Sequence, residues 1–252
     1  MVIEMKKYTI INTDRSRIYT LDTGNKKLNV HVLSTVARSD TMIAIMDQVS
    51  AKYESNTSIY QDDAASNQNA QFTRVALNSL RSEQRIGTQK KKELIKRFEN
   101  LKQPIPLNQA DLVFERDYVR QLTALPFAER AKVLLGPLTV EETSALLRHG
   151  DLAKLIGDQP ELAREVESAH MVHVAANIIA GDHAHTATLD NPLAVGTDMA
   201  SARSAAKAKL AEMDAELEAV EASGRVIAEA VSFMAAASDL DAETLFAELA
   251  AS

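Results

Sequence analysis

The residues whose types and spacing could do chemistry are histidines in the middle of the chain. Four of the six lie within sixteen residues: His170, His173, His183 and His185. Glu167 precedes His170 by three residues and Asp182 precedes His185 by three, so on a helix each carboxylate and imidazole would share one face. Carboxylate-bridged di-metal bundles use this half-motif twice, but the sequence does not identify their additional bridging Glu residues. We therefore predict ordinary helix and loop histidines, with a helical metalloenzyme built on residues 167–185 as an alternative.

The sequence also lacks the common sequence motifs of enzymes. It contains no His-Glu-x-x-His run, no Gly-x-Ser-x-Gly elbow, no Gly-x-x-x-x-Gly-Lys phosphate loop and no Gly-x-Gly-x-x-Gly turn. It also contains no Cys, which excludes a thiolate nucleophile, a disulfide and a Cys-ligated metal. We predict that the protein is not an enzyme and uses no cofactor.

Positive charge gathers between Arg74 and Lys102, although the formal net charge of the chain is −7. The cations that could neutralise phosphates are Arg81, Arg85, Lys90, Lys91, Lys92, Lys96 and Arg97. The aromatic residues nearby, Phe72 and Phe98, fall on the apolar stripe of the same segment, so base stacking has little support. A nucleic-acid-associated factor that uses residues 74–102 is therefore an alternative function. A solvated face, or a face for an acidic partner, is the competing interpretation.

The C-terminal segment, residues 197–252, is acidic and rich in Ala, and its apolar residues recur every seven positions. That period predicts a coiled-coil helix over residues 197–238. Its uninterrupted seam is the predicted oligomer interface: Leu210, Met213, Leu217 and Val220. Gly224 interrupts the seam and predicts a kink at Ser223–Gly224. The acidic segment and the basic segment could steer assembly by opposite charge. The sequence leaves open whether the seam pairs within one chain or between chains.

The remaining elements follow from local patterns. Residues 7–36 are rich in β-branched and aromatic types, with turn formers between them, and predict three short antiparallel strands. A helix over 40–53 should follow, capped by Ser39 or Asp40. Residues 54–69 are polar and without apolar periodicity, which predicts a linker.

Residues 70–101 predict one long helix with a weak point at Gly87, stopped by Pro104 and Pro106. Further on, frequent Gly and Pro predict short helices at 108–124, 127–135, 139–149, 151–156 and 160–180. Thr139, with Glu142 three residues later, should cap the third of these, and Pro160 should begin the last. Residues 239–241, with an Asp at each end, should cap a short final helix.

Taken together, these elements predict a mainly α fold with a small N-terminal β meander, long helices, a compact helical middle domain and a C-terminal heptad helix. The expected segments are 1–55, 70–103, 107–196 and 197–252. The chain has 252 residues and is 46% hydrophobic, enough for a folded core, and it shows neither a membrane span nor a secretory signal. We expect a cytoplasmic structural or assembly protein, or one incorporated into a particle assembled there, such as a virion. It should act as a homo-oligomer, with other structural proteins and nucleic acid as possible further partners and no contact with a membrane.

Overall fold

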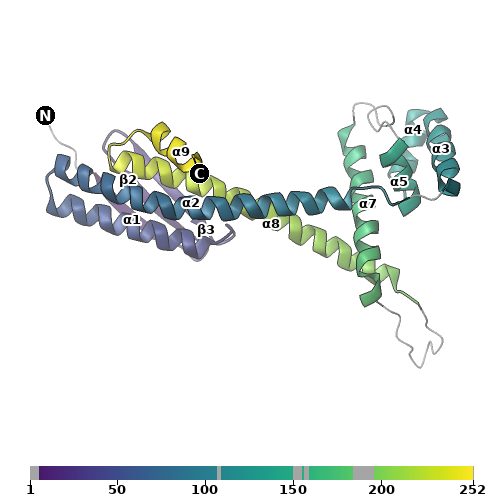
Figure 1. Cartoon of the computed structure of the whole chain (residues 1–252), viewed down its shortest axis with the longest axis horizontal. Coiled ribbons are helices and arrows are strands. Elements are labelled where there is room, and N and C mark those ends of the chain that lie inside the picture. Colours follow the sequence, from purple (N-terminus) through teal and green to yellow (C-terminus); the bar gives the residue numbers. More distant parts are fainter. Residues whose placement is uncertain (1–5, 107–108, 150–154, 156–158, 184–195, 252) are drawn as a thin grey trace, which may run out of the picture. The chain divides into compact units, whose positions relative to one another are not determined.

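A computed structural model describes residues 6–106, 109–149, 155, 159–183 and 196–251 (Figure 1). The strands are β1 (Lys7–Asn12), β2 (Ser16–Asp22) and β3 (Lys27–Leu33). The helices are α1 (Ser39–Ile59), α2 (Asp62–Leu101), α3 (Gln109–Ala124), α4 (Phe127–Leu134), α5 (Val140–His149), α7 (Pro160–Ile179), the short 3₁₀ helix η1 (Ala180–Asp182), α8 (Met199–Ala237) and α9 (Ala242–Ala250). The predicted fold class, mainly α with an N-terminal meander, is confirmed. None of the described helices is both long and apolar enough to cross a membrane.

The chain divides into two compact units. Unit 1 comprises Met1–Glu93 and Ala215–Ser252, and unit 2 comprises Leu94–Asp214. Unit 2 is therefore inserted between the two parts of unit 1 along the chain. Because α2 and α8 each contribute residues to both units, the units group the chain differently from the four segments expected from the sequence.

The sheet of unit 1 is antiparallel with the strand order β1-β2-β3. Both connections are tight, as predicted: Thr13 N–H donates to the Ser16 carbonyl at 2.9 Å, and Gly24 takes a φ of 78° that suits glycine. Alternate side chains point to the inner face, and four of them are fully buried there: Tyr19, Leu21, Val30 and Val32. The strand alternation thus separates a core face from an outer face.

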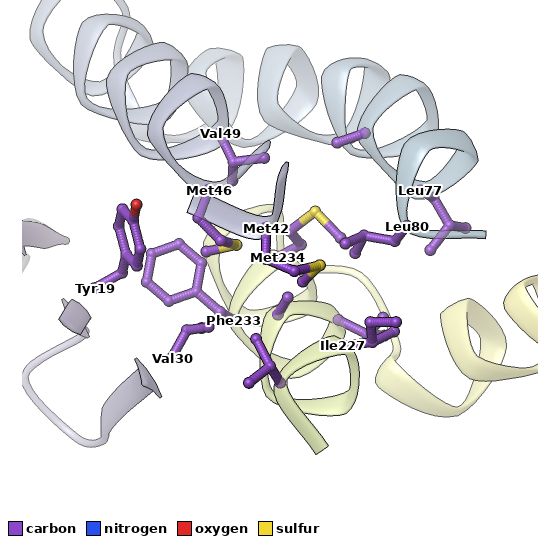
Figure 2. Packing of buried hydrophobic residues seen from close by; sticks show 14 of the residues in the cluster. Tyr19, Val30, Met42, Met46, Val49, Leu77, Leu80, Ile227, Phe233 and Met234 are labelled. Carbon is purple, nitrogen blue, oxygen red and sulfur yellow. The ribbon is translucent and has the colours of Figure 1, made fainter. Parts of the chain in front are cut away.

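One apolar core joins the inner face of this sheet to α1, α2, α8 and α9. Figure 2 shows side chains that meet there: Tyr19 and Val30 from the sheet, Met42, Met46 and Val49 from α1, Leu77 and Leu80 from α2, and Ile227, Phe233 and Met234 from α8. Burying each side chain of this size contributes about 1.5–3 kcal/mol. The flexible side chains of Met42 and Met46 in α1 and of Met234 in α8 fill the space between these two helices and the sheet.

Residues 54–69 are helical, so the prediction of a linker is wrong. Only a two-residue connection separates α1 from α2. Asn56 and Asn69 are each 1% exposed, and Asn56 Nδ2 donates to Asn69 Oδ1 at 2.7 Å. Asn69 Nδ2 donates in turn to the Ala237 carbonyl at 3.1 Å. The buried face of both helices continues through these residues, but amides replace apolar side chains on it, and the hydrophobic pattern therefore lapses.

The predicted cap of α1 is also wrong, because neither Ser39 nor Asp40 precedes its first turn. Arg38 does, in a left-handed conformation with a φ of 57°. Its guanidinium binds both carboxylate oxygens of Glu83, with Nη2 at 2.9 Å from Oε1. Glu83 is buried, and a buried carboxylate requires such a partner.

Both long helices run unbroken through their glycines. Neither the weak point predicted at Gly87 nor the kink predicted at Ser223–Gly224 interrupts its helix. A Cβ on Gly87 would lie 3.8 Å from Val220 Cγ1, an ordinary contact, whereas a Cβ on Gly224 would meet nothing within 4 Å. The ladder of helical hydrogen bonds outweighs the glycine penalty of roughly 1 kcal/mol at each site.

Unit 2 consists of helices that meet in two apolar clusters. The first draws Leu122, Leu134, Leu138, Leu146, Leu155, Leu162 and Val166 from α3, α4, α5, α7 and the segments beside them. The second joins α7 to the first part of α8 and contains Val172, Ala176, Ala202, Ala206 and Leu210. The predicted short helix at 151–156 lies outside the described residues except for Leu155, which is helical and buried.

Three predicted helix starts are confirmed. Thr139 N–H donates to Glu142 Oε2 at 2.7 Å, and Glu142 N–H donates to Thr139 Oγ1 at 3.2 Å, which is a reciprocal capping box before α5. Pro160 stands in the first turn of α7. Asp241 caps α9 by accepting a hydrogen bond from Thr244 N–H at 2.8 Å. Local chemistry of the sequence therefore sets these helix ends.

Candidate interaction interface

The residues predicted to form an oligomer interface lie on the buried face of α8. Leu210, Met213 and Val220 are each less than a tenth exposed, and Leu217 is half-buried. Leu210 belongs to the second apolar cluster of unit 2, and Val220 lies against Gly87 of α2 within unit 1. The chain itself covers most of this seam. A role for the seam between subunits stays a prediction.

Opposite charges of α2 and α8 meet within unit 1. Lys90 Nζ lies 2.7 Å from Glu216 Oε1, and Lys91 Nζ lies 2.8 Å from Glu221 Oε1. The hydrogen bond and charge of Lys91 hold the pKa of the Glu221 carboxyl below its ordinary value. Exposed pairs of this kind contribute little to stability, because water screens their attraction. The charge complementarity seen in the sequence therefore has contacts inside one chain that align the two helices.

The other predicted phosphate-binding cations fall into two groups. Arg81 is half-buried and donates from Nη2 to the Glu248 carbonyl of α9 at 2.6 Å, so its guanidinium has a structural partner. Four cations are exposed and form no ion pair within the part of the chain that the structure describes: Arg85, Lys92, Lys96 and Arg97. Arg85 and Lys92 belong to unit 1, whereas Lys96 and Arg97 belong to unit 2.

An open polar cleft of about 340 Å³ separates α2 from α8 beside Gly87 and Gly224, within unit 1. Its lining includes charged and hydroxyl side chains: Glu83, Thr88, Lys91, Glu221, Ser223 and Arg225. Glu83 is bound by Arg38, and Lys91 is bound by Glu221. Because these charges neutralise one another, the cleft offers a hydrogen-bonding surface rather than an activated acid, base or nucleophile.

The first two histidines of the predicted cluster have structural partners in unit 2. His170 is fully buried, and burial lowers its pKa, which favours the neutral ring. Nε2–H donates to the Gln103 carbonyl at 3.0 Å, and Nδ1 lies 3.0 Å from the Thr143 hydroxyl. His173 Nε2 lies 2.8 Å from the Leu138 carbonyl, to which it donates. Both imidazoles therefore tie α7 to neighbouring segments.

The carboxylates expected beside these histidines are placed elsewhere. Glu167 Oε2 binds Lys102 Nζ at 2.7 Å rather than His170. Asp182 and His183 lie at the end of η1, and His185 lies outside the described residues. Within the described ranges, no three His, Asp or Glu residues are grouped so that they could hold a metal ion.

One buried carboxylate in unit 2 escaped the sequence analysis. Glu115 of α3 is 1% exposed, with Oε2 at 2.9 Å from His149 Nε2 and 3.7 Å from Arg148 Nη1 of α5. Arg148 also donates to the Ile105 carbonyl. In the sequence Glu115 resembles any polar residue of an amphipathic helix, and no local signal marks its burial. It joins α3 to α5 by charge as well as by packing.

Comparisons with protein families, with curated proteins and with solved structures found no match to this chain.

Proposed function

We propose that the protein is a non-enzymatic structural or assembly protein that works as a homo-oligomer. The observation that carries the proposal is the open sheet of unit 1, which packs its inner face on the core. Large apolar side chains of β1 and β3 remain exposed: Ile10 at 39%, Ile11 at 49% and Leu33 at 40%. Apolar side chains that stay exposed on the edge strands of a small open sheet favour association with another protein surface. A second copy of the chain is present wherever the protein is made, so it is the partner that we propose.

The state of the polar side chains also favours a structural role. Both ring nitrogens of His170 and the carboxylate of Glu83 are occupied by partners within the chain. Lys90 and Lys91 are likewise bound to carboxylates of α8. These groups hold elements together, and none of them is poised for proton transfer or attack.

Long helices and composition support the finer parts of the proposal. α2 has 40 residues and α8 has 39, and the heptad of α8 is typical of a coiled coil. The absence of Cys suits a reducing compartment, which supports assembly in the cytoplasm. Such a component would suit a large particle such as a virion.

A second surface supports contact with other structural proteins. Consecutive helices of unit 2, α3 and α4, carry exposed apolar side chains on them or directly after them: Val113, Phe114, Phe127, Val133 and Leu135. Exposed apolar residues in such number favour a protein partner over water.

A nucleic-acid-associated role remains the second candidate. It would rest on the four exposed cations of α2 that form no ion pair among the described residues, fewer than the seven considered from the sequence. Fewer phosphate contacts mean weaker and less salt-dependent binding. The open sheet is therefore the better basis for a function.

The test is the mass of the protein in solution, measured by light scattering over a wide range of protein concentrations. We expect a multiple of 27.5 kDa. Because the proposed surface is apolar, the mass should be the same at about 0.05 M and about 0.5 M salt, which screens charges strongly. A chain that is monomeric at every concentration would overturn the proposal.

A further inference from the structure

The two edges of the sheet in unit 1 differ in whether another part of the chain covers them. At the β3 edge, His31 N–H donates to Glu229 Oε2 of α8 at 3.0 Å. The β1 edge has no such cover among the described residues. A sheet edge with unpaired N–H and C=O groups is a template for another strand.

The register identifies which groups of β1 are unpaired. Along a strand of an antiparallel sheet, the backbone N–H and C=O groups of successive residues point alternately to the strand on one side and to the other side. Thr13 N–H donates to the Ser16 carbonyl at 2.9 Å, so the odd-numbered residues of β1 bond to β2. The even-numbered residues Tyr8, Ile10 and Asn12 therefore direct their N–H and C=O groups outward.

The hydrogen bonds of β3, at the other side of the sheet, follow the same alternation. Ser34 N–H donates to the Arg15 carbonyl at 2.8 Å, so the even-numbered residues at β3 bond to β2. His31 should then face outward, and its N–H does reach Glu229.

The β1 edge lacks the features by which proteins protect an open edge. The strand contains no Pro, and its one charged residue, Lys7, stands at its beginning. Ile10 and Ile11 in its second half are exposed on opposite faces of the sheet. An edge that is unpaired and carries exposed apolar side chains favours association.

We infer that β1 pairs antiparallel with β1 of a second copy, with Ile10 on the two-fold axis, so that the two sheets become one. This inference rests on the proposed homo-oligomer and names its interface. The three outward residues are symmetric about Ile10: Tyr8 lies opposite Asn12 of the second copy, and Ile10 lies opposite Ile10. Every outward N–H and C=O then has a partner, and the two-fold symmetry closes the assembly as a dimer.

Side-chain chemistry selects this direction and register. Lys6 binds Asp239 of its own chain at 2.8 Å, but Lys7 comes opposite Thr13 of the second copy, next to Asp14, so opposite charges lie near each other at both ends. A parallel arrangement would instead set Lys7 beside Lys7. On the outer face Thr9 lies opposite Ile11, a β-branched pair of the kind that stabilises sheets.

Ile10→Pro is the direct test, because it removes an outward N–H and leaves the bonds of β1 to β2 in place. We expect the dimer to weaken on the order of 100-fold, since two interchain hydrogen bonds are removed at the axis. The circular dichroism spectrum should be unchanged. If the Ile10→Pro variant folds and is still a dimer, the interface is overturned, whereas the proposed function stands.

A charge-swap experiment tests the register without relying on proline. Ile10→Lys and Ile10→Glu should each weaken the dimer, because like charges face each other across the axis. An equal mixture of the two variants should form heterodimers, detected by native mass spectrometry. The matched control is the same pair of substitutions at Ile11, which faces Thr9 rather than itself, so its mixture should contain heterodimers only in the proportion expected from random exchange of subunits.

The outcomes separate the two proposals. An excess of heterodimers over random exchange in the Ile10 mixture alone supports the interface and its register. Random proportions in both mixtures, with the parent dimeric, contradict the interface only. A parent that is monomeric at every concentration contradicts both the interface and the homo-oligomer.

Discussion

Replacing Asn69 with Ala should destabilise unit 1 by roughly 2–4 kcal/mol. Asn69 accepts a hydrogen bond from Asn56 at 2.7 Å and donates one to the Ala237 carbonyl at 3.1 Å, and both contacts are buried. The substitution leaves the Asn56 amide and the Ala237 carbonyl without partners in the core. Each buried group left without its partner costs about 1–2 kcal/mol, which gives the expected sum.

Urea unfolding followed by tyrosine fluorescence is the assay. Of the five Tyr residues, only Tyr118 lies in unit 2, so the signal reports chiefly on unit 1. A double-mutant cycle with Asn56→Ala should show a coupling of about 1 kcal/mol or more, because each substitution removes the same hydrogen bond.

Asn67→Ala is the matched control, since Asn67 stands on the same helix but is exposed. It should leave stability unchanged or raise it by a few tenths of a kcal/mol, because Ala favours helix more than Asn does. If Asn69→Ala cost no more than Asn67→Ala, the buried amides would not hold α1, α2 and α8 together.

Three further predictions concern other parts of the molecule. Gly224→Ala should raise the free energy of unfolding by roughly 0.5–1 kcal/mol in urea titrations, because the helix gains propensity and the new methyl meets open space; a decrease would show that this space is filled. His170 has a lowered pKa in the folded chain, whereas the unfolded chain takes up its proton near pH 6.5, so thermal stability should fall as the pH is lowered from about 7 to about 5. His170→Gln should flatten the dependence of thermal stability on pH, and His31→Ala, at an exposed site, should not. If the parent and both variants lost stability equally as the pH falls, His170 would not be its cause. If α2 binds nucleic acid, Arg85→Gln with Lys92→Gln should reduce the slope of log K against log salt by about 0.9 for each duplex phosphate that is no longer neutralised, and an unchanged slope would remove that candidate function.

Much of the secondary structure could be predicted because it depends on short-range chemistry. The reciprocal bonds of Thr139 and Glu142 begin a helix whatever lies beyond it. The heptad of α8 was equally legible, and its first-position residues from Ala206 to Met234 are all buried: Ala206, Met213, Val220, Ile227 and Met234. A helix buries the face on which its apolar side chains recur, so the period alone identifies that face.

The candidate surfaces could be predicted only in part. The sequence identified the cations of α2 and the acidic residues of α8 but not their pairing, because Lys90 and Glu216 are far apart along the chain. It also identified the three antiparallel strands without showing which edge of their sheet stays open. That difference depends on Glu229 of α8 reaching His31, a contact between residues separated by 198 positions.

The sequence by itself determined which residues form strands, where several helices begin and which face of α8 is buried. Only the tertiary structure decided what covers each face, and it overruled the sequence where Asn56 and Asn69 take core positions. The physical reason is that an amide is as stable in a core as an apolar side chain only when its hydrogen bonds are satisfied. The partner that satisfies Asn69, the Ala237 carbonyl, is 168 residues away and is brought within reach by the fold alone.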